Sequence, residues 1–439
     1  MNGAYRSLRQ DTRVVFFAVF AILLACSGEL STPYIAHDDL PLLFDRTDHF
    51  WPKTLEEGRW ITYLWSQVSI FLTPRTSFLS FILLFLCFLC SYVRRADWVT
   101  SERMLFLAAL VVSSAAITDA SGWPTYLIPS VALLALFAFV SSRLTGRHER
   151  SAVLVVFTFL VCLAHPSFAY CILLFRLSQP RHEGARSALI EVVLFFAAMA
   201  AALLTTMVLN HVFHGYFGVK IADWRQPHPA DSVDLYLENL GRGFRACLVA
   251  LQAHGIQLIC WIAGLLSLLV AGRRRAAMIC LLALAACFAG HLVLTAQTGV
   301  FVPLRGFVWL PFALTMPWLR AARLDRLKNV FRVATAGVLL VALASFNDKA
   351  ELQRDQLQRA NAIARRARSE GVSRVFVVSA SSFGGFRQYD LSAKLNYQFD
   401  TTTVSCDVLP QECEALAAAA QSGIFKTSSG GVDTLVVKL

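Results

Sequence analysis

Long apolar runs, separated by short charged stretches, fill the first 346 residues of the chain. A helix needs about 20 apolar residues to cross a bilayer, so runs of this kind predict membrane spans. The apolar segments cover roughly residues 14–34, 76–93, 104–119, 125–141, 151–164, 166–177, 187–212, 246–271, 276–297, 302–319 and 329–346. The pattern predicts an α-helical polytopic membrane protein with about 11 transmembrane helices. The composition agrees, because only 16% of the residues are charged, against about 25% in soluble proteins.

The fifth and sixth apolar segments are each too short to span a bilayer alone. The stretch "LVCLAHPSFAY" separates them at His165 and Pro166, because proline disfavours a helical conformation in the residue before it. The two segments can form a hairpin of short spans or one kinked helix. The choice matters because it decides on which side of the membrane every later loop lies.

Basic residues are shared unevenly between the two sets of loops. With the N-terminus inside and both short segments counted, 20 arginines and lysines lie in cytoplasmic loops and 9 in the opposite loops. Cytoplasmic loops carry the basic excess in membrane proteins, so this orientation is favoured, and "AGRRRAA" stays inside. The same rule accounts for the net charge of +11 without a nucleic-acid partner. A bacterial inner membrane and a periplasmic outer side are the predicted setting.

The N-terminal segment imitates a signal peptide. Arg6, Arg9 and Arg13 precede "VVFFAVFAILLAC", and the "LLAC" that ends at Cys26 resembles a lipoprotein cleavage site. However, the apolar character continues past Cys26 and many further spans follow. An uncleaved signal anchor is therefore the simpler interpretation.

Two long loops are predicted on the outer side of this transmembrane domain, at 35–75 and 213–245. The first contains "GRWITYLWSQVSIFL", whose apolar and aromatic residues recur at helical spacing. This predicts an amphipathic interfacial helix with Trp60, Tyr63 and Trp65 at the level of the lipid headgroups. The second is rich in proline, glycine and aromatic residues, which favours an ordered loop.

After residue 346 the composition changes, and residues 347–439 predict a small α/β domain on the outer side. "NDKAELQRDQLQRANAIARRARSEG" is typical of a charged helix, "SRVFVVSAS" and "VDTLVVKL" of strands, and "QECEALAAAAQSG" of a helix between them. Cys406 and Cys413 lie in this domain, away from the apolar segments. An oxidising compartment would allow a disulfide between them.

Carboxylates gather just past the first apolar segment, in "YIAHDDLPLLFDRTDHFWPKTLEEGRW". At the mouth of a membrane cavity, Asp38 or Asp39 could deprotonate an acceptor hydroxyl. The alternative is a solvated acidic loop. The sequence does not decide which of the pair would be the base, and Asp39 is preferred only because Asp38 lies nearer the membrane helix.

Three basic residues on the outer side are candidates for binding a phosphate: Arg59 in "EGRW", Arg225 in "DWRQPHP" and Arg305 in "VPLRGFVWLP". A guanidinium fork fits a phosphate or a carboxylate. The alternatives are ion pairs with Asp38 or Asp39, or extension of the side chain to lipid headgroups.

Four other polar residues are weaker candidates. His37 and His165 could line the same site, although His165 is also explained as a polar residue at a helix break. Glu29 and Asp119 are acids near the outer ends of apolar segments, where intramembrane acids are functional candidates and capping or water contact is the alternative.

A divalent cation is a further option for the first outer loop. His37, Asp38, Asp39, Asp48 and His49 supply enough oxygen and nitrogen donors for Mg²⁺ or Mn²⁺, but their spacing matches no recognised cation loop. No cofactor is assigned with certainty. The sequence contains no Walker loop, dinucleotide fingerprint or zinc-type pair of CxxC motifs, which argues against a nucleotide-powered pump.

Taken together, "HDDLPLLFDR", the "EEGRW" that follows it, the late Arg305 segment and the C-terminal α/β tail resemble the type C glycosyltransferase superfamily. The stretch is most similar to Gtr-type O-antigen glucosyltransferases. The aminoarabinose transferase and protein mannosyltransferase branches of the superfamily have the same general arrangement. The resemblance implies a catalytic acid at Asp38 or Asp39. It also implies an inverting transfer of a sugar from a polyprenyl-phosphate donor to an envelope glycan such as O-antigen.

Two other classes remain open. A flippase or transporter of lipid-linked sugars would use the acids as gates or proton carriers, although the chain lacks the internal repeat that many transporters show. An O-antigen polymerase or ligase would depend more on arginine and histidine in the outer loops than on paired aspartates.

Overall fold

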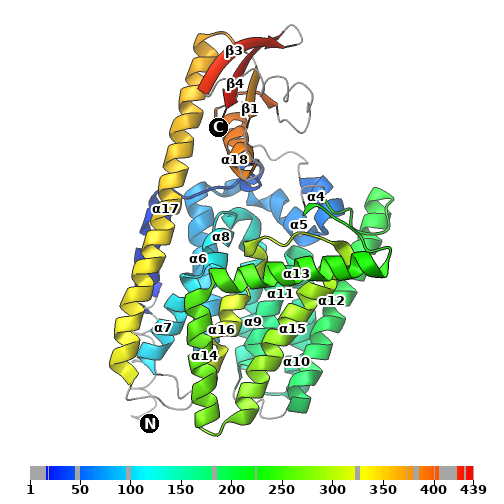
Figure 1. The fold of residues 1–439 in the computed structure, drawn as a ribbon, viewed down its shortest axis with the longest axis vertical. Helices are drawn as coiled ribbons and strands as arrows, with labels where there is room; N and C mark the ends of the chain where they lie inside the picture. The colour runs from blue at the N-terminus through cyan, green and yellow to red at the C-terminus, as the bar shows by residue number, and fades with distance from the viewer. Residues whose placement is uncertain are drawn as a thin grey trace.

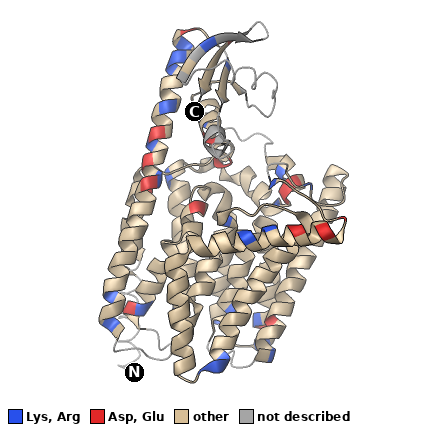
Figure 2. Ribbon diagram, in the orientation of Figure 1, with Lys and Arg blue, Asp and Glu red and all other residues tan. Residues whose placement is uncertain are grey.

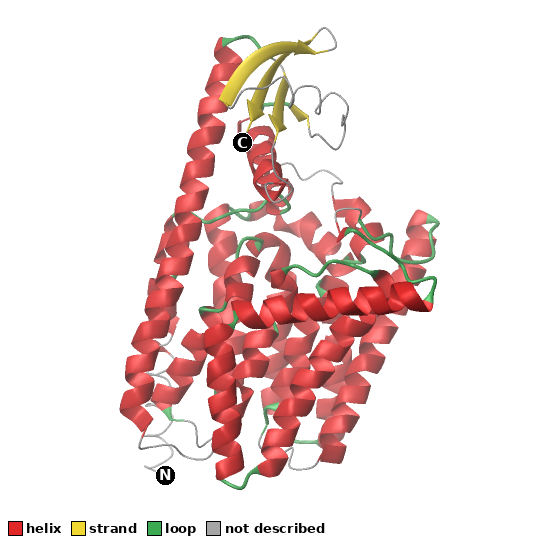
Figure 3. Ribbon diagram, viewed as in Figure 1, coloured by secondary structure: helices red, strands yellow, loops and turns green. Residues whose placement is uncertain are grey.

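A computed structural model of the chain describes residues 16–17, 19–44, 50–94, 100–179, 185–222, 225–321, 327–372, 374–378, 385–399, 401–404, 423–429 and 432–438. Helices dominate this part of the chain, and a small sheet follows them near the C-terminus (Figure 3). Most of the helices are aligned in one bundle, and the first described residues and the sheet lie at its opposite ends (Figure 1).

Membrane-length helices form the frame of the bundle. Five helices in the described residues are long and apolar enough to cross a bilayer: α6 (Pro74–Val93), α9 (Pro124–Arg143), α12 (Ala185–His214), α15 (Arg274–Thr298) and α17 (Lys328–Ser369). A sixth is gained if the bent pair α13 (Val233–Ala253) and α14 (Gly255–Val270) counts as one span. The protein is therefore a helical membrane protein. The larger number of eleven spans stays a prediction, because the other bundle helices are shorter or, in α10 (Arg147–Ala164), carry charges.

Three apolar segments that the sequence predicts as continuous are broken in the structure. The segment 104–119 divides into α7 (Ser101–Val112) and α8 (Ala115–Ala120), because the side chain of Ser114 caps a new helix. The segment 302–319 divides into η3 (Leu304–Phe307) and α16 (Leu310–Arg320), where Pro311 stands in the first turn of α16.

The third broken segment is 246–271, and its correction also changes the second outer loop. Residues 233–253 form α13, which crosses the end of the bundle almost perpendicular to it (Figure 1), and α14 follows after a bend of 87°. Ser232 caps α13 through a bond from the backbone N–H of Leu235. The predicted loop 213–245 is thus partly a helix, whose amphipathic sequence lets it lie across the bundle.

The break at His165 is present as expected. α10 ends at Ala164 and α11 (Pro166–Leu177) begins at Pro166, with His165 itself in an extended conformation. The two helices pack against each other along their lengths, so they form a hairpin and not one kinked helix. His165 consequently lies at the turn of the hairpin, at the same end of the bundle as α8 and the start of α9.

Arginines hold together the opposite end of the bundle, where Figure 2 shows basic residues around the start of α17 and between α14 and α15. The sequence places Arg103, Arg176 and Arg320 in loops, but all three are buried. Arg103 donates to the carbonyls of Trp318 and Ala321, and Arg320 to those of Leu177 and Gln179. Carbonyls at helix C-termini lack partners within the helix, so a guanidinium fork stabilises them there.

Short helices cover the end of the bundle that carries α8. They are α2 (Ser27–Ser31), α3 (Asp39–Phe44), α4 (Phe50–Glu57), α5 (Trp60–Val68) and η1 (Ser69–Phe71). The expected position of the α5 aromatics among lipid headgroups is wrong for Trp60, which is buried and donates to Asn210 Oδ1 at 3.2 Å. Trp65 donates to the carbonyl of Thr125 at 2.9 Å. α5 therefore packs into the protein and positions the loop before it.

The last span continues without a break into the predicted charged helix, so α17 reaches from the arginine-rich end to the sheet (Figure 1). The sheet has the order β2-β1-β4-β3, with β3 antiparallel to β4 and the other pairs parallel. Its strands are β1 (Arg374–Val378), β2 (Thr403–Val404), β3 (Gly423–Ser429) and β4 (Val432–Lys438). β1 and β4 match the two predicted strands. The sequence did not suggest α18 (Gly385–Phe399), which packs against α17 and α3.

Cys406 and Cys413, and nearly all of the predicted helix "QECEALAAAAQSG", lie outside the described residues, so the disulfide stays a prediction. Two large hydrophobic cores and a small one are distinct within the described residues. One large core fills the bundle, and the other lies between α17, α18 and the sheet, around Val375, Leu395 and Leu435. The small one consists of Ile35, Leu40 and Leu43. We call α18 and the sheet the C-terminal unit.

Candidate functional site

A small pocket, here called the charged pocket, lies at the covered end of the bundle, where the α10–α11 hairpin turns. It is lined by Asp38, Glu57, Arg59, Trp123, Tyr126, Leu127, His165, Arg225 and Arg305. Its volume of about 20 Å³ leaves room for little more than one water molecule. The structure thus shows a closed arrangement, which must widen to admit a larger ligand.

Glu57 organises one wall of the charged pocket. Its carboxylate lies 3.1 Å from Arg59 Nε and 3.6 Å from Arg225 Nη2, and it accepts a hydrogen bond of 2.9 Å from the Tyr126 hydroxyl. Burial opposes the ionisation of Glu57, but Arg59, Lys53 and Arg225 lower its pKa to about 2. The charge of Glu57 therefore holds the two arginines in place at neutral pH.

Asp38 also lines the charged pocket and remains partly accessible. Lys53 Nζ donates to Asp38 Oδ1 at 2.6 Å, and His37 Nε2 lies 3.7 Å from the same oxygen. Burial again opposes ionisation, yet Lys53 and His37 hold the pKa of Asp38 well below its usual range. Asp38 is thus an ionised carboxylate that faces three arginines across a very small space.

Asp39 points away from the charged pocket and is fully buried. Its two carboxylate oxygens accept hydrogen bonds from the backbone N–H groups of Thr125 at 2.6 Å and Tyr126 at 3.0 Å. These N–H groups belong to the first turn of α9, which has no partner for them within the helix. Burial raises the pKa of Asp39 to about 7. Asp39 therefore caps α9, and Asp38 is the aspartate that can meet a ligand.

Arg305 is a further lining residue of the charged pocket. Its guanidinium stacks over the Trp123 ring at 4.0 Å, and its backbone N–H donates to Asp119 Oδ2 at 3.0 Å. Asp119 thus fixes the loop that carries Arg305, in keeping with a local structural role for this acid. Among the described residues, neither Trp123 Nε1 nor His165 Nδ1 has a hydrogen-bond partner. Buried polar atoms are seldom left unpaired, so these two point to a polar guest in the pocket.

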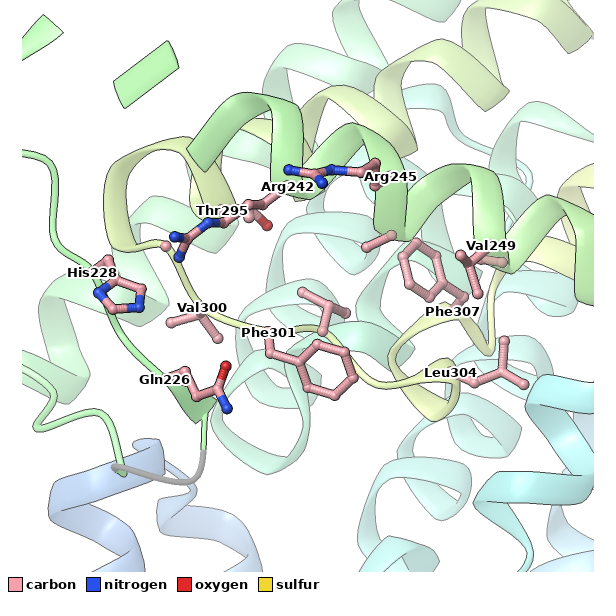
Figure 4. Close-up of a pocket in the computed structure, with 14 residues that line it drawn as sticks. Gln226, His228, Arg242, Arg245, Val249, Thr295, Val300, Phe301, Leu304 and Phe307 are labelled. Carbon is pink, nitrogen blue, oxygen red and sulfur yellow. The ribbon is translucent and has the colours of Figure 1, made fainter. Parts of the chain in front are cut away.

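A second, larger cavity lies beside the charged pocket, and we call it the apolar cavity (Figure 4). Its volume is about 620 Å³. Figure 4 shows Phe301, Leu304 and Phe307 along one wall, and Arg242 and Arg245 coming from α13. The cavity is mostly apolar, as ligand cavities commonly are, with a few cations at its edge.

The two cavities have neighbouring walls. Arg225 lines the charged pocket and Gln226 the apolar cavity, and Arg305 lies between Leu304 and Phe307. The backbone N–H of Phe301 donates to the carbonyl of Arg225 at 3.0 Å, and that of His228 to the carbonyl of Thr298 at 2.9 Å. These bonds fasten the two segments side by side. A molecule with a charged group and an apolar chain could therefore occupy both cavities at once.

Five of the residues that the sequence singles out come together in the charged pocket: Asp38, Arg59, Arg225, Arg305 and His165. His37 lies beside Asp38, whereas Asp39 lies behind the wall. Sequence reasoning missed Glu57, Lys53, Trp123 and Tyr126 as partners of these residues. The nearness of Glu57 to Arg59 in "EEGRW" could have suggested the first of them.

The suggested metal site finds no support in the described residues. Among them, no group of three or more histidine, cysteine, aspartate or glutamate side chains is placed to hold an ion. Asp48 and His49 lie outside the described residues. Asp38 pairs with Lys53, and Asp39 faces α9.

Comparison with known proteins adds no relative: the chain matches no family model, no curated protein and no solved structure.

Proposed function

We propose that the protein is an inverting membrane glycosyltransferase that moves a sugar from a polyprenyl-phosphate donor to a glycan acceptor outside the cytoplasm. The observation that carries the proposal is the charged pocket beside the apolar cavity. Three arginines, two carboxylates and two buried polar atoms without partners surround one small space at the end of a membrane bundle. This combination suits a lipid-linked phosphate better than a free metabolite.

The donor phosphate would bind to Arg59, Arg225 and Arg305. These three arginines and Lys53 outnumber the carboxylates of Asp38 and Glu57, so an anion would balance the charge. Guanidinium forks bind phosphate with two parallel hydrogen bonds. Trp123 Nε1 can add a donor, as can His165 Nδ1 in the tautomer that carries its proton there.

The apolar part of the donor would lie in the apolar cavity, along Phe301 and Phe307. Its position beneath α13, which crosses the end of the bundle, suits entry from the lipid phase. A phosphate held at Arg305 would then lie near the apolar wall at Leu304, the neighbouring residue.

The reaction would use Asp38 as the base. The acceptor hydroxyl attacks the anomeric carbon, the bond from that carbon to the phosphate oxygen breaks, and the hydroxyl proton passes to Asp38 and then to solvent. The polyprenyl phosphate leaves as an anion that the arginines stabilise. The ion pair with Lys53 makes Asp38 a weak base. A weak base suffices where the hydroxyl becomes acidic as its bond to an oxocarbenium-like carbon forms.

We place the covered end of the bundle and the C-terminal unit outside the cytoplasm, in the periplasm of a bacterium, with up to eleven spans. The support is the arginine-rich opposite end (Figure 2), since basic residues concentrate on the cytoplasmic side. The sugar, the acceptor and the choice of O-antigen or another envelope glycan follow only from the resemblance to type C glycosyltransferases.

Transfer of labelled sugar from a synthetic polyprenyl-phosphate sugar by the purified protein in detergent tests the proposal. Envelope glycan serves as the acceptor, and Asp38→Asn protein is the control. We expect transfer by the wild type and at least a hundredfold less by the variant. If the wild type instead moves the intact donor across a liposome bilayer, and Asp38→Asn leaves that rate unchanged, the protein is a flippase and the proposal is wrong.

A further inference from the structure

The C-terminal unit touches the loop that carries the candidate base. Two side chains of α18 reach the stretch 34–37. Asp390 bonds the Tyr34 hydroxyl, and Lys394 Nζ donates to the carbonyl of Ile35 at 3.1 Å and also to Gln356 Oε1 of α17 at 2.7 Å. Asp390 and Lys394 are buried. These contacts join segments more than 300 residues apart in the chain, within a few residues of Asp38.

Asp390 also contacts His37 at two atoms. Its Oδ1 accepts a hydrogen bond from the His37 backbone N–H at 2.8 Å and lies 2.9 Å from His37 Nδ1. A carboxylate at Nδ1 keeps a proton on that nitrogen and fixes the orientation of the ring. His37 Nε2 then faces Asp38, at 3.7 Å from its Oδ1. The imidazole is thus held between two carboxylates, one from each end of the chain.

We propose that Asp390 is a positioning residue of the charged pocket, acting through His37 on Asp38. The activity expected of this arrangement rests on the glycosyl transfer proposed above. The arrangement itself rests only on the contacts of His37.

The charges around His37 favour its protonated form. Burial opposes protonation, but Asp38 and Asp390 together raise the pKa of His37, against a smaller opposing effect of Lys53. The Trp123 ring meets it edge-on, with 6.5 Å between ring centroids, and adds no charge. The imidazolium therefore stands beside Lys53 as a second cation on Asp38 and holds its carboxylate toward the pocket. Lys394 is the other cation near Asp390.

Asp390→Asn tests this role, because asparagine keeps the size of the side chain and an oxygen that can accept from the His37 N–H, but removes the charge. The pKa of His37 should fall, because one of the two carboxylates that raise it is lost. It can be measured by NMR titration of histidine-labelled protein, with His37→Gln protein to assign the signal. In the transfer assay, the alkaline limb is the loss of activity as the pH rises and His37 loses its proton. For Asp390→Asn, this limb should move to lower pH by as much as the pKa of His37 falls.

Tyr34→Phe is the matched control, since it removes another partner of Asp390 in the same contact and leaves the charge beside His37. In Tyr34→Phe protein, we expect His37 to titrate as in the wild type and the alkaline limb to be unchanged. Asp390→Glu should partly restore both. His37→Gln, which cannot be protonated, should lack the alkaline limb.

Three results would overturn the inference. The first is an unchanged His37 titration in folded Asp390→Asn protein. The second is equal shifts in Asp390→Asn and Tyr34→Phe, which would assign a purely structural role. The third applies if Asp390→Asn does not fold: it is a pH profile of His37→Gln protein that still shows the alkaline limb. A shifted titration in a protein without transfer activity would support the inference and refute the proposed function instead.

Discussion

Replacing each aspartate of the Asp38–Asp39 pair by asparagine should have opposite consequences. Asp39→Asn should destabilise the fold and leave the rate of sugar transfer nearly unchanged, because the carboxylate of Asp39 caps α9. Asp38→Asn should abolish transfer and leave the fold, because its carboxylate faces the charged pocket. The two residues are adjacent in sequence and differ only in where their side chains point.

The magnitudes follow from the contacts. Asp39 accepts two backbone hydrogen bonds, and asparagine can keep only one, with its amide group turned to the other N–H. Loss of a helix N-cap costs about 0.5–2 kcal/mol, and an unsatisfied buried donor about 1–3 kcal/mol, so we expect a loss of about 1–2 kcal/mol. Asp38→Asn retains an oxygen for Lys53 and removes only a partly exposed ion pair. The charge that it removes also pairs with His37, at a site where Asp38 is only 23% exposed, so some stability is lost, but the retained oxygen should leave the protein folded.

The effect on turnover should be reversed. Loss of a general base lowers the rate by roughly 10²–10⁴, equivalent to about 2.7–5.4 kcal/mol in the activation free energy. That loss belongs to Asp38→Asn. Asp39→Asn should keep its turnover per folded molecule to within roughly tenfold, a smaller loss than removal of a base produces.

The pH dependence of stability gives an independent check. Burial raises the pKa of Asp39 from its ordinary 3.8 to about 7, so between these values the folded protein holds a proton that the unfolded chain has lost. The contribution of Asp39 to stability therefore falls as the pH rises from about 4 to about 7, and is flat above. Asparagine does not titrate. The destabilisation by Asp39→Asn should consequently shrink between pH 5 and pH 8.

Thermal unfolding in detergent and initial rates of sugar transfer, measured on the same preparations at several pH values, provide the assay. The reasoning is refuted if Asp39→Asn loses a hundredfold or more in turnover with an unchanged unfolding temperature. It is equally refuted if Asp38→Asn keeps more than about a tenth of the wild-type turnover, above the range expected for loss of a base.

Three further variants test other parts of the molecule. Arg305→Lys keeps the charge but loses the planar fork and the stack on Trp123; carrier affinity and transfer should fall roughly tenfold, which is about 1.4 kcal/mol. Arg332→Lys, at an exposed position at the other end of the bundle, is its control. If Arg305→Lys leaves carrier affinity and transfer unchanged, Arg305 is only an anchor. Glu191→Gln breaks the buried pair with Arg176, whose Nη2 lies 2.5 Å from Glu191 Oε1, and should destabilise the bundle by about 3–5 kcal/mol in thermal unfolding; a loss under about 1 kcal/mol would show that the pair is hydrated. A reporter fused after Leu439 should be active only in the periplasm, and cytoplasmic activity would reverse the orientation.

The apolar pattern by itself determined the class of the protein and most of its long helices. α6, α9, α12 and α15 each begin and end within about two residues of the predicted segments, since a bilayer imposes a length and a hydrophobicity that are visible in the sequence. The break at His165 followed from the proline after it. The arginines of the charged pocket were also visible, because a guanidinium beside an apolar segment is unusual enough to require a partner.

Only the tertiary structure decided how these pieces meet. Which of two adjacent aspartates faces the pocket depends on where the first turn of α9 lies, 86 residues further along the chain, and no local pattern encodes that position. For the same reason, Arg103, Arg176 and Arg320 looked like loop residues. The structure places Arg103 and Arg320 beside helix ends and Arg176 beside Glu191. The contact between His37 and Asp390 spans 353 residues. Side-chain charges find their partners through space after the backbone has folded, whereas apolar periodicity acts along the chain and can be recognised before it folds.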